Sequence, residues 1–416
     1  MGKKGLSSAM NAVVRVALEV VQGMQAPIGK VSENKLYDNI EEILNIPYVN
    51  RIGVPLALDI FKPTGKEYEG KELPVIVEIH GGGLVTGDRK NVVDCSREFA
   101  SRGYLVFSIE YRLAPRATVC DEFDDICAGL DFVGQKLVEY DVDFSRMFLT
   151  ADSAGAFLGL YAAAMKHSEK LQDVIGFKKS RMVFKALGFS CGMFYTHEDD
   201  LLGNILSNQL YGNKMNDEEF LKFMNPEHPE IINNLPPVFL VTSRGDFLNK
   251  YTIKFFEALK AAGKKAKMLY YAEESLFHTF NFASPRLPQS QDSIDKMLDY
   301  FEEQADIQRK AASKEAIYTA TDEELEEFYA NQEKKYEPED LSAFISLFKD
   351  QSYRNIEMFK TIKDVLALSA KEKKERDDDE EAGPAGMSEE AQIQLMKLIG
   401  ILFDSYEIDH YFEQES

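Results

Sequence analysis

Seven short apolar runs, separated by helix-like stretches, place the tightest limits on how this chain can fold. The runs are 56–61, 73–80, 104–111, 146–150, 183–190, 238–242 and 267–271. Between several of them apolar residues recur at helical spacing, over about 91–102, 120–140, 154–167, 250–262 and 290–304. Apolar strands that alternate with helices predict an α/β fold, with a mostly parallel central sheet flanked by helices on both faces.

The segments outside this alternation suggest a division of the chain. Residues 8–25 and 33–46 have helical periodicity, which predicts a helical cap segment over 1–48. The α/β domain then spans 49–304. Within it, 193–235 shows no strand pattern, so we expect an inserted helical cap or lid. Its Met193, Phe194 and Tyr195 would suit an apolar ligand, or equally plain core packing.

Charge is concentrated at the C-terminal end of the sequence. The net charge is −22, and residues 301–416 hold 14 Lys and Arg against 30 Asp and Glu. We therefore expect an acidic helical extension over 305–416. It is either a solvated surface or a module that binds a protein partner or a second copy of the chain. The overall charge argues against binding to nucleic acid or to anionic membranes, because both need clustered basic residues.

Targeting and redox features favour a cytoplasmic protein. No run approaches the about 18 apolar residues that predict a membrane span, so no stable membrane insertion is expected. The first residues lack the clean apolar run of a signal peptide. The four cysteines Cys95, Cys120, Cys127 and Cys191 have neither C-x-x-C nor zinc-site spacing. We expect free and mostly buried thiols, as in a reducing compartment, and no metal site.

The first chemical motif is Ala151-Asp152-Ser153-Ala154-Gly155, between an apolar strand and a small-residue helix. Small residues around a serine allow the sharp strand-to-helix turn that exposes a nucleophile. The turn would also direct the Ala154 amide toward the reacting atoms. In isolation, the same pentapeptide could be a serine that merely caps a helix.

The second motif is His80-Gly81-Gly82-Gly83, directly after a predicted strand. Glycines let backbone amides approach a ligand oxygen, because no Cβ stands in the way. Donors placed in this way stabilise the oxyanion that forms when a carbonyl is attacked. The plainer interpretation is a flexible turn, which the serine downstream makes less attractive.

An acid and a base complete the pattern. Asp246 follows the run at 238–242, and His278 follows the run at 267–271. The order Ser, Asp, His is that of a triad built on strand ends. His278 would remove the proton of Ser153, and Asp246 would orient the imidazole. Activity is expected to fall in acid as His278 becomes protonated.

Taken together, the motifs resemble the hormone-sensitive-lipase-like carboxylesterases of the α/β-hydrolase fold. The resemblance rests on His80-Gly81-Gly82-Gly83, Tyr111-Arg112-Leu113-Ala114-Pro115 and Asp152-Ser153-Ala154-Gly155, and covers about residues 50–300. It implies an N-terminal helical cap, hydrolysis of short-to-medium acyl esters, and no metal or cofactor. It also implies an oxyanion hole at Gly81, Gly82, Gly83 and Ala154, with Gly81 shaping the turn.

The sequence departs from the family pattern in three places. Ala151 and Ala156 stand where the family commonly has Gly, and Thr279 follows His278 where Gly is frequent. Residues 305–416 have no counterpart in the family. These differences bear on the choice of substrate more than on the chemistry.

The sequence thus predicts a serine hydrolase acting on small-molecule carboxylic esters through an acyl-enzyme. Two other functions stay open. The first is a binding or receptor protein that keeps the hydrolase fold without turnover. The second is an amidase or peptidase that uses the same triad.

Overall fold

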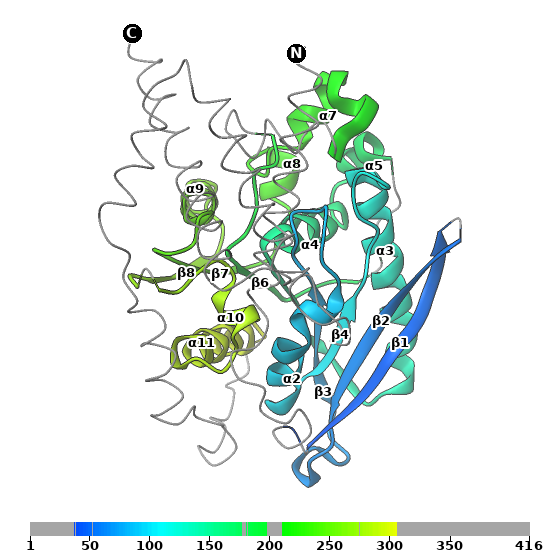
Figure 1. Ribbon diagram of the computed structural model, residues 1–416, viewed down its shortest axis with the longest axis vertical. Coiled ribbons are helices and arrows are strands. Elements are labelled where there is room, and N and C mark those ends of the chain that lie inside the picture. The colour runs from blue at the N-terminus through cyan, green and yellow to red at the C-terminus, as the bar shows by residue number, and fades with distance from the viewer. Residues whose placement is uncertain are drawn as a thin grey trace, which may run out of the picture. The chain divides into compact units, whose positions relative to one another are not determined.

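An eight-stranded sheet forms the centre of the described part of the chain (Figure 1). The computed structural model describes residue 37 and residues 39–305, except for residues 52, 177–179, 181, 198–209 and 274. The strands are β1 Ile40–Arg51, β2 Val54–Pro63, β3 Leu73–Ile79, β4 Leu105–Ile109, β5 Val142–Asp152, β6 Ala186–Ser190, β7 Val238–Ser243 and β8 Ala266–Tyr271. Each of the seven predicted apolar runs overlaps one strand from β2 to β8, so the predicted α/β class is confirmed.

The sheet is mostly parallel, in the order β1-β2-β4-β3-β5-β6-β7-β8. Strands β3 to β8 pair in parallel, while β2 pairs antiparallel with both β1 and β4. The carboxyl ends of the parallel strands therefore share one edge of the sheet. The loops after β3, β5, β7 and β8 carry the motif residues to that edge, which is where such sheets place their sites.

Helices cover both faces of the sheet (Figure 1). One face packs against α2, α10 and α11, and the other against α3, α4 and α9, with α5, α7 and α8 outside α4. The helices are α2 Val93–Ser101, α3 Val119–Lys136, α4 Ser153–Met165, α5 Glu169–Ile175, α7 Glu218–Phe223, α8 Pro229–Ile232, α9 Asn249–Ala261, α10 Phe280–Ala283 and α11 Pro288–Gln304.

Helix α4 is apolar on all sides because it is enclosed on all sides. Every one of its 13 residues is buried. A helix with no polar face is stable only in a core. On the opposite face of the sheet, Phe148 of β5 stacks on Phe301 of α11 with ring centroids 4.6 Å apart. Strand β5, which ends directly before Ser153, is thus held from both faces.

The predicted helix over 33–46 is wrong, because residues 40–51 form β1. A bulge explains the error. The β1–β2 register shifts between Ile43 and Ile46, beside Asn45 at φ 60°. The extra residue leaves Ile40, Ile43 and Ile46 half-buried at a spacing of three, which mimics a helical period. A cap segment ending at residue 48 is therefore wrong at its C-terminal boundary, and residues 1–36 lie outside the described residues.

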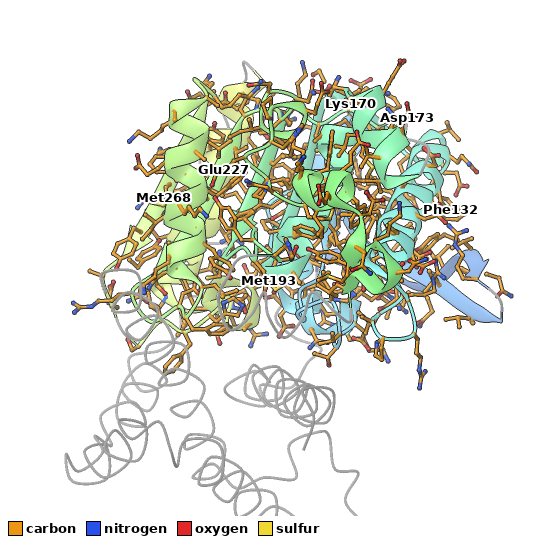
Figure 2. All side chains as sticks on the ribbon, turned by 90° about the horizontal axis from the view of Figure 1, so that it is seen from above. Phe132, Lys170, Asp173, Met193, Glu227 and Met268 are labelled. Carbon is orange, nitrogen blue, oxygen red and sulfur yellow. The ribbon has the colours of Figure 1, made fainter. Side chains whose placement is uncertain are left out.

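The described part of 193–235 consists of short helices joined by turns and irregular segments. It contains η4 Gly212–Asn216, α7 and α8, and no strand among its described residues. In the view from above, Met268 of β8 and Phe132 of α3 lie at opposite sides, with Met193 between them (Figure 2). The predicted helix at 8–25 and the extension over 306–416 lie outside the described residues. Within the described part of the chain, no helix has the length and apolar character needed to cross a bilayer.

Candidate active site

Ser153 lies at the sharp turn where β5 ends and α4 begins. Its φ of 47° is in the left-handed region. Helix α4 approaches the end of β3 so closely that a Cβ on Gly155 would lie 2.2 Å from the carbonyl oxygen of Ile79 and 2.5 Å from that of His80. No side chain fits in that space, so position 155 requires glycine. This contact is the physical basis of the small-residue pattern around the serine.

The structure brings Ser153, His278 and Asp246 together in one hydrogen-bonded line. His278 Nε2 lies 2.8 Å from Ser153 Oγ, and His278 Nδ1 lies 2.6 Å from Asp246 Oδ1. All three side chains are buried. An isolated bridge between Gly245 and Phe277 joins the loops after β7 and β8, and so brings the acid to the histidine.

Asp246 is held as a carboxylate. Its Oδ1 also accepts the amide of Leu248 at 2.9 Å, and its Oδ2 accepts the hydroxyl of Thr242 at 2.7 Å. Burial favours the neutral acid, but the charge and hydrogen bond of His278 and these two donors outweigh it, so the pKa of Asp246 lies below its ordinary value. A carboxylate held in this way fixes the tautomer of His278 with the proton on Nδ1.

Strained backbone is concentrated at this site. Five described non-glycine residues have positive φ, and four of them lie in the site loops. These four are Leu84, Ser153, Cys191 and Thr279. Thr279 has φ 57°. A positive φ favours glycine, which explains why glycine is frequent at this position in the family that the motifs resemble. Such strain persists only where the surrounding structure enforces it, as functional sites often do.

The glycine loop after β3 presents amides next to Ser153. Gly82 has φ 119° and Gly83 has φ 62°, so the loop follows a path open to glycine. Within the described part of the chain, the amides of Gly82, Gly83 and Ala154 have no hydrogen-bond acceptor. Amides without acceptors beside a serine hydroxyl suit a developing oxyanion.

Gly81 differs from the other three predicted oxyanion residues. Its amide donates to Asp152 Oδ1 at 2.7 Å. A Cβ at Gly81 would lie 2.5 Å from Asp152 Oδ2 and 3.0 Å from Ser153 Cβ. Because its N–H is already paired, Gly81 is not itself an oxyanion donor. Its expected part in shaping the turn fits these contacts.

Asp152 is the chief residue that sequence reasoning missed. It lies directly before Ser153, and burial raises the pKa of its carboxyl to about 6, against the lowering effect of His80, His278 and the Gly81 amide. Phe247 was also missed, although it follows Asp246 directly. Its ring lies 4.3 Å from that of His278. Adjacency to a predicted site residue is the signal that points to both.

The three apolar residues singled out after β6 are all buried. The amide of Met193 donates to the carbonyl of Ser153 at 2.9 Å, so this residue adjoins the nucleophile. Phe194 stacks against Phe255 and contacts Phe189, which is core packing. Position 193 therefore adjoins the backbone of Ser153, and position 194 belongs to the core.

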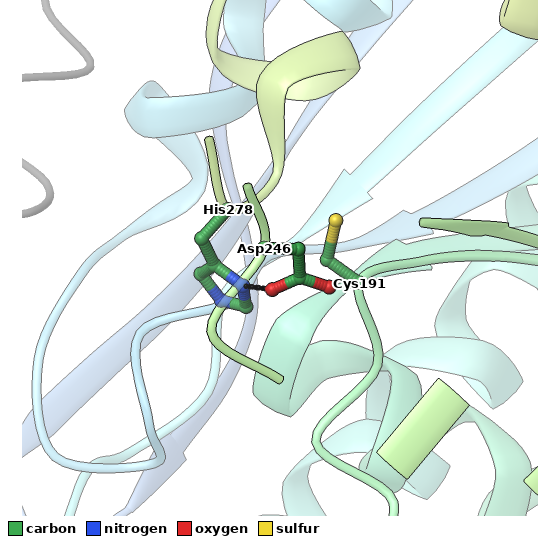
Figure 3. A group of neighbouring side chains, drawn as sticks. All are labelled: Cys191, Asp246 and His278. Atoms are coloured by element: carbon green, nitrogen blue, oxygen red, sulfur yellow. Dashed lines mark hydrogen bonds and ion pairs between the residues drawn. The ribbon is translucent and has the colours of Figure 1, made fainter. Parts of the chain in front are cut away.

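Cys191, Asp246 and His278 form the one group of possible metal ligands found in the described residues (Figure 3). Their ligand atoms lie within 4.8 Å of one another. Burial and the charge of Asp246 raise the pKa of the Cys191 thiol well above its ordinary value. Only the thiolate is a good metal ligand. Asp246 and His278 are already hydrogen-bonded to each other. The donor set therefore fits a metal ion poorly. All four cysteines are free, as expected.

The strand order and the position of the site at the strand ends are those of the α/β-hydrolase fold. A family model described as BD-FAE matches residues 58–252. Esterase B from Lactobacillus rhamnosis superposes with a TM-score of 0.64 at 19% identity, over 74% of this chain and 97% of that one. A bacterial heroin esterase superposes with a TM-score of 0.52 at 20% identity, over 67% and 87%.

Two curated relatives are esterases by name. A probable isoprenylcysteine alpha-carbonyl methylesterase of Oryza sativa is 28% identical over 57% of this chain and 58% of its own length. Carboxylesterase NlhH of Mycobacterium tuberculosis is 29% identical over 51% and 68%. The chain spans less than two thirds of the plant protein it matches. These matches agree with the resemblance to the α/β-hydrolase carboxylesterases that was inferred from the motifs.

Proposed function

We propose that this protein is a serine hydrolase that cleaves carboxylic esters of short-to-medium acyl chains through an acyl-enzyme intermediate. The observation that carries the proposal is the line from Ser153 Oγ through His278 to Asp246, beside amides that have no acceptor. The match to the family model supports it, as do the names of relatives called carboxylesterase or methylesterase.

In the first half-reaction, Ser153 Oγ attacks the ester carbonyl as His278 Nε2 takes the hydroxyl proton. The carbonyl oxygen becomes an oxyanion and accepts hydrogen bonds from the amides of Gly82, Gly83 and Ala154. Asp246 stabilises the imidazolium. The bond to the leaving oxygen then breaks, and His278 returns its proton to the departing alcohol.

In the second half-reaction, water replaces the alcohol. His278 takes a proton from the water, the hydroxide adds to the acyl carbon, and the same amides hold the new oxyanion. The bond to Ser153 Oγ breaks, and His278 gives the serine its proton back. The products are one carboxylic acid and one alcohol, and no cofactor is consumed.

A cytoplasmic location is part of the proposal. The four unpaired thiols support it, because oxidising compartments favour disulfides. The ligand expected is a small-molecule ester, and the buried Met193 beside Ser153 supports an apolar acyl group. The expected partner surface on residues 305–416 lies outside the described residues.

The test is hydrolysis of p-nitrophenyl esters of increasing acyl length by the full chain and by Ser153→Ala. We expect turnover that vanishes in the variant, with the length profile reporting the acyl group preferred. A fluorophosphonate probe should label the wild type and leave Ser153→Ala unlabelled, which checks the nucleophile without any assumption about substrate.

Ser145→Ala is the matched control. Ser145 lies in the same strand, β5, but its side chain is exposed and bonds to Asp143. This variant should hydrolyse and label like the wild type. Labelling without turnover on any ester would point to a binding protein or to a specialised substrate. Faster cleavage of matched p-nitroanilides than of esters would favour an amidase. Retained turnover in Ser153→Ala would overturn the assignment.

A further inference from the structure

The direction of the Gly82 amide depends on groups outside the glycine loop, because the loop has no side chains of its own to fix it. A peptide bond is planar and trans, so the C=O of Gly81 and the N–H of Gly82 point in opposite directions. Whatever holds the Gly81 carbonyl therefore also sets the direction of the Gly82 N–H. In the preceding peptide unit, the His80 carbonyl and the Gly81 N–H are joined in the same way.

Three side chains hold these two peptide units. His80 Nδ1 lies 2.8 Å from the Gly81 carbonyl oxygen. Tyr111 donates its hydroxyl to the His80 carbonyl at 2.9 Å, and its ring stacks on the imidazole with centroids 4.3 Å apart. Asp152 accepts the Gly81 amide at 2.7 Å. A carbonyl oxygen can only accept, so the Nδ1 of His80 carries a proton.

Glu110 is the charged group that faces the other ring nitrogen. His80 is fully buried, and its Nε2 lies 3.3 Å from Glu110 Oε1 in an ion-pair contact. Nδ1 already donates a hydrogen bond, so an unprotonated Nε2 would direct its lone pair at the Glu110 carboxylate. That arrangement is repulsive and favours a proton on Nε2. Burial opposes a charged ring, but Glu110, the Gly81 carbonyl and Asp152 outweigh burial, and the pKa of His80 is raised.

Glu110 is itself held from the far side by Arg89. Arg89 Nη1 donates to Glu110 Oε2 at 2.9 Å, and Arg89 Nε lies 2.8 Å from Asp59 Oδ2. Burial would raise the pKa of Glu110, but His80 and Arg89 outweigh it and lower the pKa. A continuous row of charged groups thus runs from Asp59 on β2 through Arg89 and Glu110 to His80, next to the glycine loop.

We propose that Glu110 is a positioning residue for the oxyanion hole, acting through His80 on the Gly81 carbonyl and so on the Gly82 amide. The inference rests on the proposed function, since only an ester or related carbonyl would develop an oxyanion there. Glu110 touches neither the nucleophile nor its base. Its loss should weaken binding of the transition state and leave binding of the ground-state ester nearly unchanged.

The experiment compares Glu110→Gln with wild type in kcat and KM for a p-nitrophenyl ester, and in the inhibition constant of an alkyl trifluoromethyl ketone. Such a ketone adds the serine oxygen and forms an oxyanion that mimics the intermediate. We expect kcat to fall about 10-fold or more, since loss of one donor costs about 10² to 10³. We expect KM to stay within about twofold. The inhibition constant of the ketone should rise by the same factor by which kcat/KM falls.

Glu302→Gln is the matched control. Glu302 is a glutamate on α11 that pairs with an arginine, Arg146, as Glu110 pairs with Arg89. The Glu302→Gln variant should have a lower thermal midpoint of unfolding, with kcat and ketone binding at wild-type values. A Glu110→Gln protein that folds with wild-type kcat and ketone binding would overturn the inference, as would a change in KM alone.

Asp59→Asn serves if Glu110→Gln does not fold. It loosens Arg89, and through it Glu110, without touching His80. A smaller fall in kcat with matching loss of ketone binding supports the inference, and wild-type values for both overturn it. If wild type itself neither hydrolyses the ester nor binds the ketone, the proposed function fails first. If wild type does both and the variants do so equally well, the inference alone fails.

Discussion

The Nε2 atom of His278 lies 2.8 Å from the Oγ atom of Ser153, although 125 residues separate them in the chain. The sheet accounts for this proximity. Ser153 follows β5 near the middle of the sheet, and His278 follows β8 at its edge. The loop after β8 reaches back past β7. There Asp246 Oδ1 accepts a hydrogen bond from His278 Nδ1 at 2.6 Å. The contact therefore depends on parallel strands that end at one edge.

Replacing Asp246 by Asn should impair catalysis while leaving the fold intact. The amide can still fill the space, but it can donate to His278 Nδ1 and so stabilise the wrong tautomer. We expect kcat for a p-nitrophenyl ester to fall by about 10⁴, with a much smaller change in KM. Asp292→Asn, at a half-exposed carboxylate on α11, is the control and should behave as wild type. A loss below about tenfold for Asp246→Asn would count against its role.

Glycine at 155 should be needed for the position of the nucleophile. A methyl group there meets two backbone oxygens at 2.2 and 2.5 Å, so α4 must move away from β3. We expect Gly155→Ala to lower the free energy of unfolding by about 1–3 kcal/mol and to reduce kcat.

Gly134→Ala supplies the contrast. Its Cβ would have only Met182 Cγ nearby, at 3.9 Å. Inside α3 this change should stabilise the protein by about 0.5–1 kcal/mol, because alanine loses less backbone entropy than glycine. Urea unfolding measures both variants. Equal effects at 155 and 134 would contradict the steric argument.

Glu78 should make the protein less stable as the pH rises. It is fully buried on β3, and burial, together with the charge of Asp152, raises the pKa of Glu78 from 4.5 to about 8, despite a hydrogen bond from Ser96. Between these values the unfolded chain releases the proton and the folded protein keeps it. Its contribution to stability is thus complete below about pH 4.5 and is lost as the pH rises to about 8, by about 1.4 kcal/mol per pH unit.

Glu78→Gln removes this titration and keeps the shape of the side chain. The difference in unfolding free energy between wild type and variant, measured in urea from pH 5 to 8, should slope in the variant's favour as the pH rises. Parallel curves over that range would show that Glu78 titrates alike in the folded and unfolded states.

The pair Arg146–Glu302 should contribute strongly to stability without affecting activity. Arg146 donates to both carboxylate oxygens of the buried Glu302, at 2.8 and 2.6 Å, and so ties β5 to α11. Arg146→Met leaves Glu302 buried without its partner, which should cost about 3–5 kcal/mol. The double variant Arg146→Met/Glu302→Gln should recover most of that loss. Its side-chain amide at position 302 can still accept the hydrogen bond from the Tyr104 hydroxyl. A double variant as unstable as the single one would contradict this account.

Local sequence was sufficient for much of the fold and for the main site residues. The apolar runs that become β3 to β8 are continuous because parallel strands are buried on both faces. Gly155 and the glycines at 82 and 83 stand where the backbone comes close to other atoms or has positive φ. Because parallel strands end at a common edge, chain order alone brought Ser153, Asp246 and His278 under consideration.

Elsewhere the sequence pattern was misleading or silent. The bulge at Asn45 gave a strand the three-residue spacing of a helix, since a bulge depends on the partner strand β2. The predicted oxyanion hole included Gly81, whose amide pairs with Asp152. That pairing requires β3 and β5 to lie side by side, which no local pattern records.

The sequence by itself therefore determined the strands β2 to β8, the sharp turn at Ser153 and the order of its partners, because these depend on side-chain size and on which residues avoid water. Only the tertiary structure decided which amides remain unpaired and how charge reaches the glycine loop. Glu110, Arg89 and Asp59 come from separate segments, and their hydrogen bonds and ion pairs act over only a few ångströms. Such interactions exist only after the core has brought those segments together.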